Sequence, residues 1–179
     1  MAHYTSKLYE LSVGALALTE AALASARESN EDQRQQCRAL LVPEPVQNDL
    51  VNNVFQVGHV KRLAIKIRNT GQYPTSSIEV RHTADIVPGT TLPDIPSSLK
   101  EEVLPGLSPG QQSRLEICTI RPLLAGDMTA INNTGSSTLF AYIELIYNDV
   151  GHSQWRSFHG WRWVQLKGWV AEPKYTRLF

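Results

Sequence analysis

The sequence predicts an all-β protein, an antiparallel β-sandwich preceded by a long N-terminal α-helix. Three observations predict this fold class. About six or seven segments have the alternating or continuously apolar pattern of strands, and turn residues separate them at regular intervals. Residues 137–164 have the pattern of two strands joined by a tight polar turn. Residues 4–36, in contrast, have the composition and periodicity of one helix.

Composition and charge are those of an ordinary soluble globular protein. The chain has 179 residues, 42% of them hydrophobic, which suits one domain or one domain with an extension. Lys+Arg and Asp+Glu both number 17, and this balance argues against nucleic acid or an anionic membrane as the partner. No apolar run reaches the roughly 18–20 residues of a membrane span, and the N-terminus lacks the pattern of a secretory signal.

The two cysteines, Cys37 and Cys118, are far apart in the sequence and form no C-x-x-C motif. We expect each to pack as a small buried apolar side chain rather than to form a disulfide or bind a metal. This cysteine usage favours a reducing compartment. We therefore expect a cytoplasmic or membrane-associated protein, with no clear sign of secretion.

The predicted N-terminal helix, residues 1–37, carries one narrow apolar stripe. Its members follow 3-4-3-4 spacing and are Leu8, Leu11, Ala15, Leu18 and Ala22. Such a stripe needs cover, which we expect from the β domain, from a second copy of the chain or from another protein. The helix is followed by a predicted β-sandwich domain at residues 38–170 and a C-terminal tail at residues 171–179.

The first strands of the β domain alternate between apolar and charged residues. We predict a strand at residues 38–42, which Pro43 ends, a second at 60–68 and a third at 78–86. In the third strand the apolar residues and His82 point inward. The second and third strands each have one polar face, so we expect them to pair antiparallel.

The second half of the domain contains a long connection and a hairpin. Residues 87–112 are rich in Pro, Gly and Ser, and we predict a short helix within them at 97–103. The next strand covers residues 112–120. The final hairpin pairs residues 139–147 with 154–164. The first of these two strands is apolar at nearly every position, which indicates cover on both faces.

Four short motifs lie in the β region: the Arg38-Ala39 start of the first strand, the run 67–74 (Ile-Arg-Asn-Thr-Gly-Gln-Tyr-Pro), the 107–110 loop and the 147–152 hairpin turn. Together they resemble a large group of uncharacterised bacterial proteins, in which a membrane-anchoring segment and a helix precede an immunoglobulin-like sandwich. The resemblance covers about residues 38–164 and implies an immunoglobulin-like β-sandwich without an established activity. It implies a membrane-tethered protein only if an upstream anchor has been removed. Physically, turn chemistry explains these motifs better than an active site does.

Histidine and nucleophile patterns predict no catalytic site. No H-x-x-x-H or H-E-x-x-H motif occurs; His152, His159 and Asp149 near the final hairpin are the best metal candidates, but turn and strand positions explain them better. Residues 106–110 spell G-x-S-x-G, yet Pro109 has no N–H with which to build an oxyanion hole. We therefore expect a non-catalytic interaction or accessory domain, not an enzyme, with no cofactor and no metal.

The C-terminal part of the chain holds all four tryptophans and an excess of basic residues. Interleaved aromatic and basic residues can bind nucleic acid or carbohydrate, and a ligand-binding module of this kind is the alternative function. The candidate binding surface comprises Trp155, Arg156, Trp161, Arg162, Trp169 and His152. The alternation of the strand favours a second interpretation, in which its tryptophans fill the core and its arginines face solvent. That interpretation leaves Trp169 as the most exposed tryptophan.

Overall fold

The structure, a computed structural model, describes residues 13, 15–16, 18–30, 38–47, 55–89, 99–131, 136–149, 154–165 and 167–178. Contacts divide the chain into two units, residues 1–38 and 39–179. In the first unit residues 18–30 are helical, as the sequence predicts for this stretch. Their side chains are exposed, including Leu18 and Ala22 of the apolar stripe, which we expected to be covered. Among the described residues, no helix is long and apolar enough to cross a membrane.

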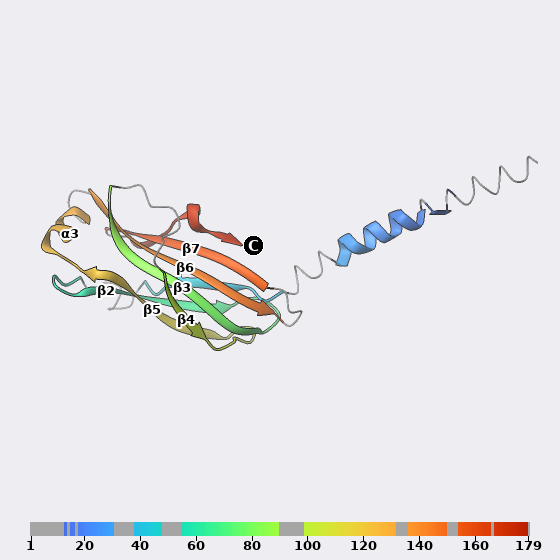
Figure 1. Ribbon diagram of the computed structural model, residues 1–179, viewed down its shortest axis with the longest axis horizontal. Coiled ribbons are helices and arrows are strands. Elements are labelled where there is room, and N and C mark those ends of the chain that lie inside the picture. The colour runs from blue at the N-terminus through green and yellow to red at the C-terminus, as the bar shows by residue number, and fades with distance from the viewer. Residues whose placement is uncertain are drawn as a thin grey trace, which may run out of the picture. The chain divides into compact units, whose positions relative to one another are not determined.

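The second unit is all-β, which confirms the predicted fold class at that level (Figure 1). Its strands are β1 (Leu41–Pro45), β2 (Val60–Asn69), β3 (Thr75–Pro88), β4 (Lys100–Leu104), β5 (Gln112–Pro122), β6 (Ser137–Asp149), β7 (Gln154–Val164), β8 (Gly168–Ala171) and β9 (Arg177–Leu178). Two short helical segments accompany them, α3 (Ala125–Thr129) and the 3-10 turn η2 (Pro173–Tyr175).

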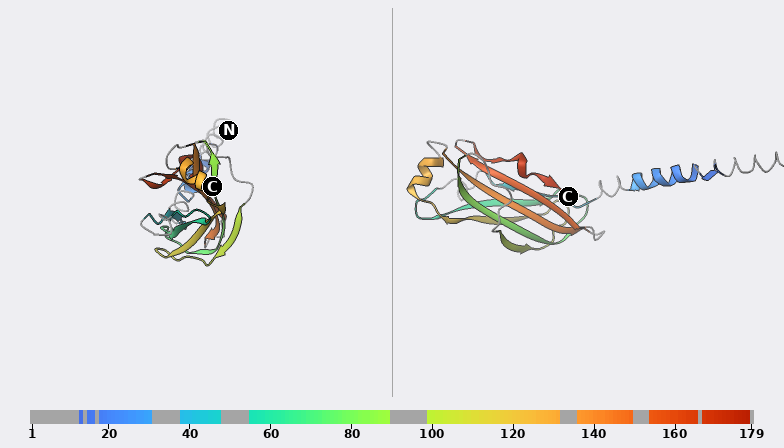
Figure 2. Two further views of the ribbon diagram at one scale, coloured as in Figure 1. Left: turned by 90° about the vertical axis from the view of Figure 1, so that its left-hand side faces the viewer. Right: turned by 45° about the horizontal axis from the view of Figure 1, so that its top comes forward.

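The strands form two antiparallel groups that enclose one core (Figures 1 and 2). One group has the order β1-β2-β5, and the other has the order β4-β3-β6-β7. Both β8 and β9 pair with β7. A single parallel pair, Ala84 with Thr119, joins β3 to β5, so the described strands make one mixed sheet.

The predicted hairpin of residues 139–164 is confirmed. β6 and β7 pair antiparallel from Phe140 opposite Arg162 to Asn148 opposite Gln154. β6 is buried over most of its length, with Ile143 fully buried, because both of its faces are covered. Its inner face contributes to the main core, and its outer face carries a second, aromatic cluster formed by Phe140, Tyr142, Phe158 and Tyr175.

Two local predictions are wrong. β2 and β3 do not pair with each other: β2 lies beside β5 and β3 lies beside β6. The alternation showed that each strand has one polar face, but it could not identify the neighbouring strand. The helix predicted at 97–103 is also wrong, because residues 100–104 form β4 and pair with β3.

The ends of the domain differ in detail from the prediction. The first strand runs from Leu41 to Pro45 and includes Pro43, which an edge strand tolerates because its outer N–H groups bond to no neighbour. Residues 171–179, predicted as a tail, include η2 and β9. Tyr175 is buried there against the outer face of the sheet.

Candidate functional site

β7 separates the predicted site residues onto two faces. Trp155, Trp161 and Trp163 pack on the main core, whereas Arg156 and Arg162 lie on the opposite face of the strand. This arrangement confirms the interpretation that the tryptophans of this strand are core residues. The strand's period of two produces it directly.

Trp155, Arg156 and Arg162 each have a local polar partner. The indole nitrogen of Trp155 donates a hydrogen bond to Asp149 Oδ2 at 2.8 Å, and Arg156 forms an ion pair with Glu144. Arg162 Nε lies 3.4 Å from a carboxylate oxygen of Glu172. Trp161 is 5% exposed. His152 lies outside the described residues.

The expectation that Trp169 is exposed is wrong, because its side chain is only 3% exposed. β8 folds back along β7, so Trp169 stands opposite Trp163, with a ring-centroid distance of 5.7 Å. Gln47 holds the backbone at this position through Nε2, which donates to the Trp169 carbonyl at 2.6 Å. The candidate aromatic and basic residues therefore do not form one continuous surface.

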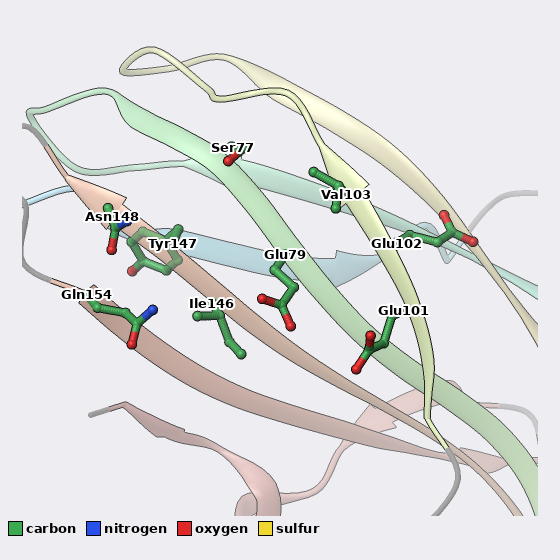
Figure 3. A pocket seen from close by; sticks show the side chains of 9 residues that line it. All are labelled: Ser77, Glu79, Glu101, Glu102, Val103, Ile146, Tyr147, Asn148 and Gln154. Atoms are coloured by element: carbon green, nitrogen blue, oxygen red, sulfur yellow. The ribbon is translucent and has the colours of Figure 1, made fainter.

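A groove of about 470 Å³ lies over β4, β3, β6 and β7 (Figure 3). We call it the outer-face groove. Its lining residues are Ser77, Glu79, Glu101, Glu102, Val103, Ile146, Tyr147, Asn148 and Gln154. Figure 3 shows the carboxylates of Glu79 and Glu101 on the same side of β4, with the Glu102 side chain on the other side.

The charges of the outer-face groove centre on Arg81. Its guanidinium lies 2.8 Å from Glu79 Oε1 and 3.1 Å from Glu101 Oε1. Among the described residues, no hydrogen bond reaches the Oε2 atom of Glu79 or of Glu101. The charge of Arg156 also acts on Glu79. One cation is thus shared by two carboxylates, and each carboxylate keeps one oxygen for a further donor.

The outer-face groove also has apolar and amide-bearing parts. The Val103 side chain is 72% exposed, and the half-buried Ile146 lies across Glu79 from it in the sheet register. Asn148 and Gln154, the last pair of β6 and β7, bring side-chain amides to one end. Apolar area beside a few polar groups is typical of a recognition surface.

Two histidines lie on the inner face of the sheet, His82 buried and His159 half-buried. His82 is 2% exposed, as predicted for its inward position, and its Nε2 lies 3.4 Å from Glu102 Oε1. Burial lowers the pKa of His82, and the nearby Glu102 opposes this shift. Burial alone lowers the pKa of His159 to about 4. Both side chains are therefore neutral in the folded protein near pH 7.

Because His159 stays neutral in the folded protein, we expect the free energy of unfolding to fall in mild acid. As the pH falls from about 6.5 to 4, the unfolded chain binds a proton at this histidine and the folded chain does not. The free energy of unfolding should fall by roughly 3 kcal/mol over this window on account of His159. Urea unfolding across pH 4–7 should show a shallower decline for His159→Gln than for the exposed-site control His59→Gln. Equal slopes in the two variants would contradict the assignment.

The other candidate groups are metal ligands and cysteines. No group of three His, Cys, Asp or Glu side chains there is placed to hold a metal ion. Cys118 is a free thiol on β5 and is exposed, so the expectation that it is buried is wrong. Cys37 lies outside the described residues.

Sequence reasoning missed the outer-face groove because its residues come from strands that are distant in the chain. The helix predicted at 97–103 includes Glu101, and a helix there could not bring this residue opposite Arg81. The outward charges of the third strand were the available signal, but charged residues have the same pattern on any strand face that is exposed to solvent.

No protein-family model, curated protein or solved structure matches the chain.

Proposed function

We propose that residues 39–179 form a non-catalytic interaction module with immunoglobulin-like organisation. The strand order supports the organisation: if the first seven strands are lettered A, B, C, C′, E, F and G, the two groups are A-B-E and C′-C-F-G. Immunoglobulin-like sandwiches divide their strands in this way, with C′ added to the C-F-G side in the variable type.

The outer-face groove is the observation that supports the interaction function. It combines the exposed Val103 with the Oε2 atoms of Glu79 and Glu101, which accept no hydrogen bond from a described residue. A rigid, well-packed sheet lies beneath it, and a rigid support limits the entropy lost on binding. The alternative binding surface on β7 draws no support from the burial of Trp161 and Trp169.

Site-specific photo-crosslinking tests the proposal. A benzophenone amino acid at position 103 lies beside the outer-face groove, whereas the same group at position 120 lies on β5, where Ile120 is 61% exposed. In the native host, irradiation should give discrete protein adducts from position 103 that position 120 does not give. The absence of adducts at position 103, or the same adducts from both positions, would contradict an interaction through this groove.

A further inference from the structure

We propose that the outer-face groove binds an extended peptide segment of a partner protein, with a basic residue and an apolar residue two positions apart. This inference rests on the proposed interaction function and adds the chemistry of the partner. It follows from three features of the groove: carboxylate oxygens without a hydrogen bond, the exposed Val103 beside the half-buried Ile146, and the spacing between these groups.

The carboxylates favour a cationic side chain. Arg81 pairs with Glu79 and Glu101, and Arg156 pairs with Glu144 and also interacts electrostatically with Glu79, so these three carboxylates exceed the two guanidinium groups by one negative charge. Glu102 adds no charge of this kind, because it pairs with Lys100 on the other side of the strand. A guanidinium or ammonium group from a partner would meet two open carboxylate oxygens, and charge-assisted hydrogen bonds of this type are the stronger ones.

The apolar side chains Val103 and Ile146 share a row of the sheet with Glu79, and Glu101 lies in the next row. In the strand register Glu101 stands opposite Arg81, and Val103 stands opposite Glu79. Side chains two residues apart on one face of a strand are about 7 Å apart. An extended peptide has the same repeat, so its residues i and i+2 can match these two rows. Burying an exposed valine against an apolar side chain is favourable by the hydrophobic effect.

The far end of the groove can bind the peptide backbone. Asn148 is exposed, Gln154 is exposed, and Ser77 lies nearby on β3. Their amides and hydroxyl offer both donors and acceptors, which a peptide backbone requires. The volume of about 470 Å³ falls within the range of ordinary ligand sites.

Fluorescence anisotropy with a designed peptide tests this inference. The probe is a fluorescein-labelled Gly-Ser-Arg-Ser-Val-Ser-Gly, and two control peptides replace its arginine by glutamate or its valine by serine. We expect saturable binding of the probe to the full chain, about tenfold weaker binding of each control peptide, and weaker binding of the probe at higher salt.

Variants of the protein locate the binding. The double variant Glu79→Gln/Glu101→Gln should weaken probe binding about tenfold, and Val103→Lys should weaken it at least as much because it adds a like charge. The matched control Glu116→Gln changes a carboxylate on β5, whose side chain is 43% exposed, and should leave the affinity within about twofold. Thermal unfolding of each variant verifies that the protein is folded.

Three results would overturn the inference: no saturable binding of the probe, equal binding of the glutamate peptide, or an equal loss of affinity in Glu116→Gln and in the double variant. Photo-crosslinking separates this failure from failure of the proposed function. Specific adducts at position 103 without probe binding would leave an interaction module whose partner has different chemistry.

Discussion

Replacing Asn69 by aspartate is expected to destabilise the β domain by about 4 kcal/mol. Asn69 is fully buried at the end of β2. Its Nδ2 donates to the carbonyls of Tyr73 at 2.7 Å and Leu107 at 2.9 Å. Its Oδ1 accepts from the N–H groups of Gly71 at 3.0 Å and Leu40 at 3.3 Å. One amide therefore ties the start of β1, the turn after β2 and the loop before β5.

An aspartate has the same shape but no donor when it is ionised. Both carbonyls would then face a buried carboxylate oxygen, and each unsatisfied buried group costs about 1–3 kcal/mol. Urea unfolding at neutral pH measures the loss, with Asn148→Asp as the matched control, because Asn148 is exposed. The control should change stability by no more than about 0.5 kcal/mol.

The deficit of the Asn69→Asp variant should shrink in acid. Burial beside two carbonyls raises the pKa of the introduced carboxyl above that of the unfolded chain, and the protonated form recovers one donor. Stability relative to wild type should therefore improve as the pH falls toward the ordinary pKa of aspartate. If Asn69→Asp were as stable as Asn148→Asp, the hydrogen bonds of Asn69 would not hold these segments together.

The same residue shows which parts of the fold were predictable. In the 67–74 motif, the hydrogen bond from the Gly71 N–H to Asn69 Oδ1 confirms the turn chemistry predicted for Asn69. The prediction that Gly71 takes positive φ is wrong. The hairpin of β6 and β7 was also predictable, because the turn and both strands lie together in the sequence. Local signals were sufficient in both places.

Non-local pairing was not predictable in the same way. The neighbour of β2 is β5, more than 40 positions later, and no local pattern specifies that choice. β4 is short and charged, so its sequence suited an exposed helix as well as an edge strand. The pairing of β4 with β3 makes this segment a strand, and it brings the β4 residues to the outer-face groove. The candidate site was missed for the same reason as the topology.

Arg156, a member of the candidate binding surface, also pairs with a buried carboxylate and should therefore stabilise the fold. Glu144 lies in the apolar run of β6 and is 1% exposed, and its ion-pair partner Arg156 extends from β7 with half of its side chain exposed. The guanidinium also lies 4.9 Å from the centre of the Phe158 ring. The buried Glu144 is thus paired with a guanidinium that reaches it from the half-exposed Arg156.

We expect the two partners to respond unequally to substitution. Arg156→Leu leaves the buried carboxylate without its cation and should cost about 3–4 kcal/mol. Glu144→Leu leaves a half-exposed guanidinium that water can solvate, so its cost should be much smaller. The double variant Glu144→Leu/Arg156→Leu should recover most of the loss, because apolar replacement of a buried ion pair is often close to neutral.

Urea unfolding of the two single variants and the double variant gives the coupling free energy directly. Arg162→Leu is the matched control: it lies on the same face of β7, its side chain is 45% exposed, and its partner Glu172 is partly open to solvent. That variant should lose no more than about 1 kcal/mol. If Arg156→Leu cost no more than Arg162→Leu, Arg156 would be dispensable for the fold.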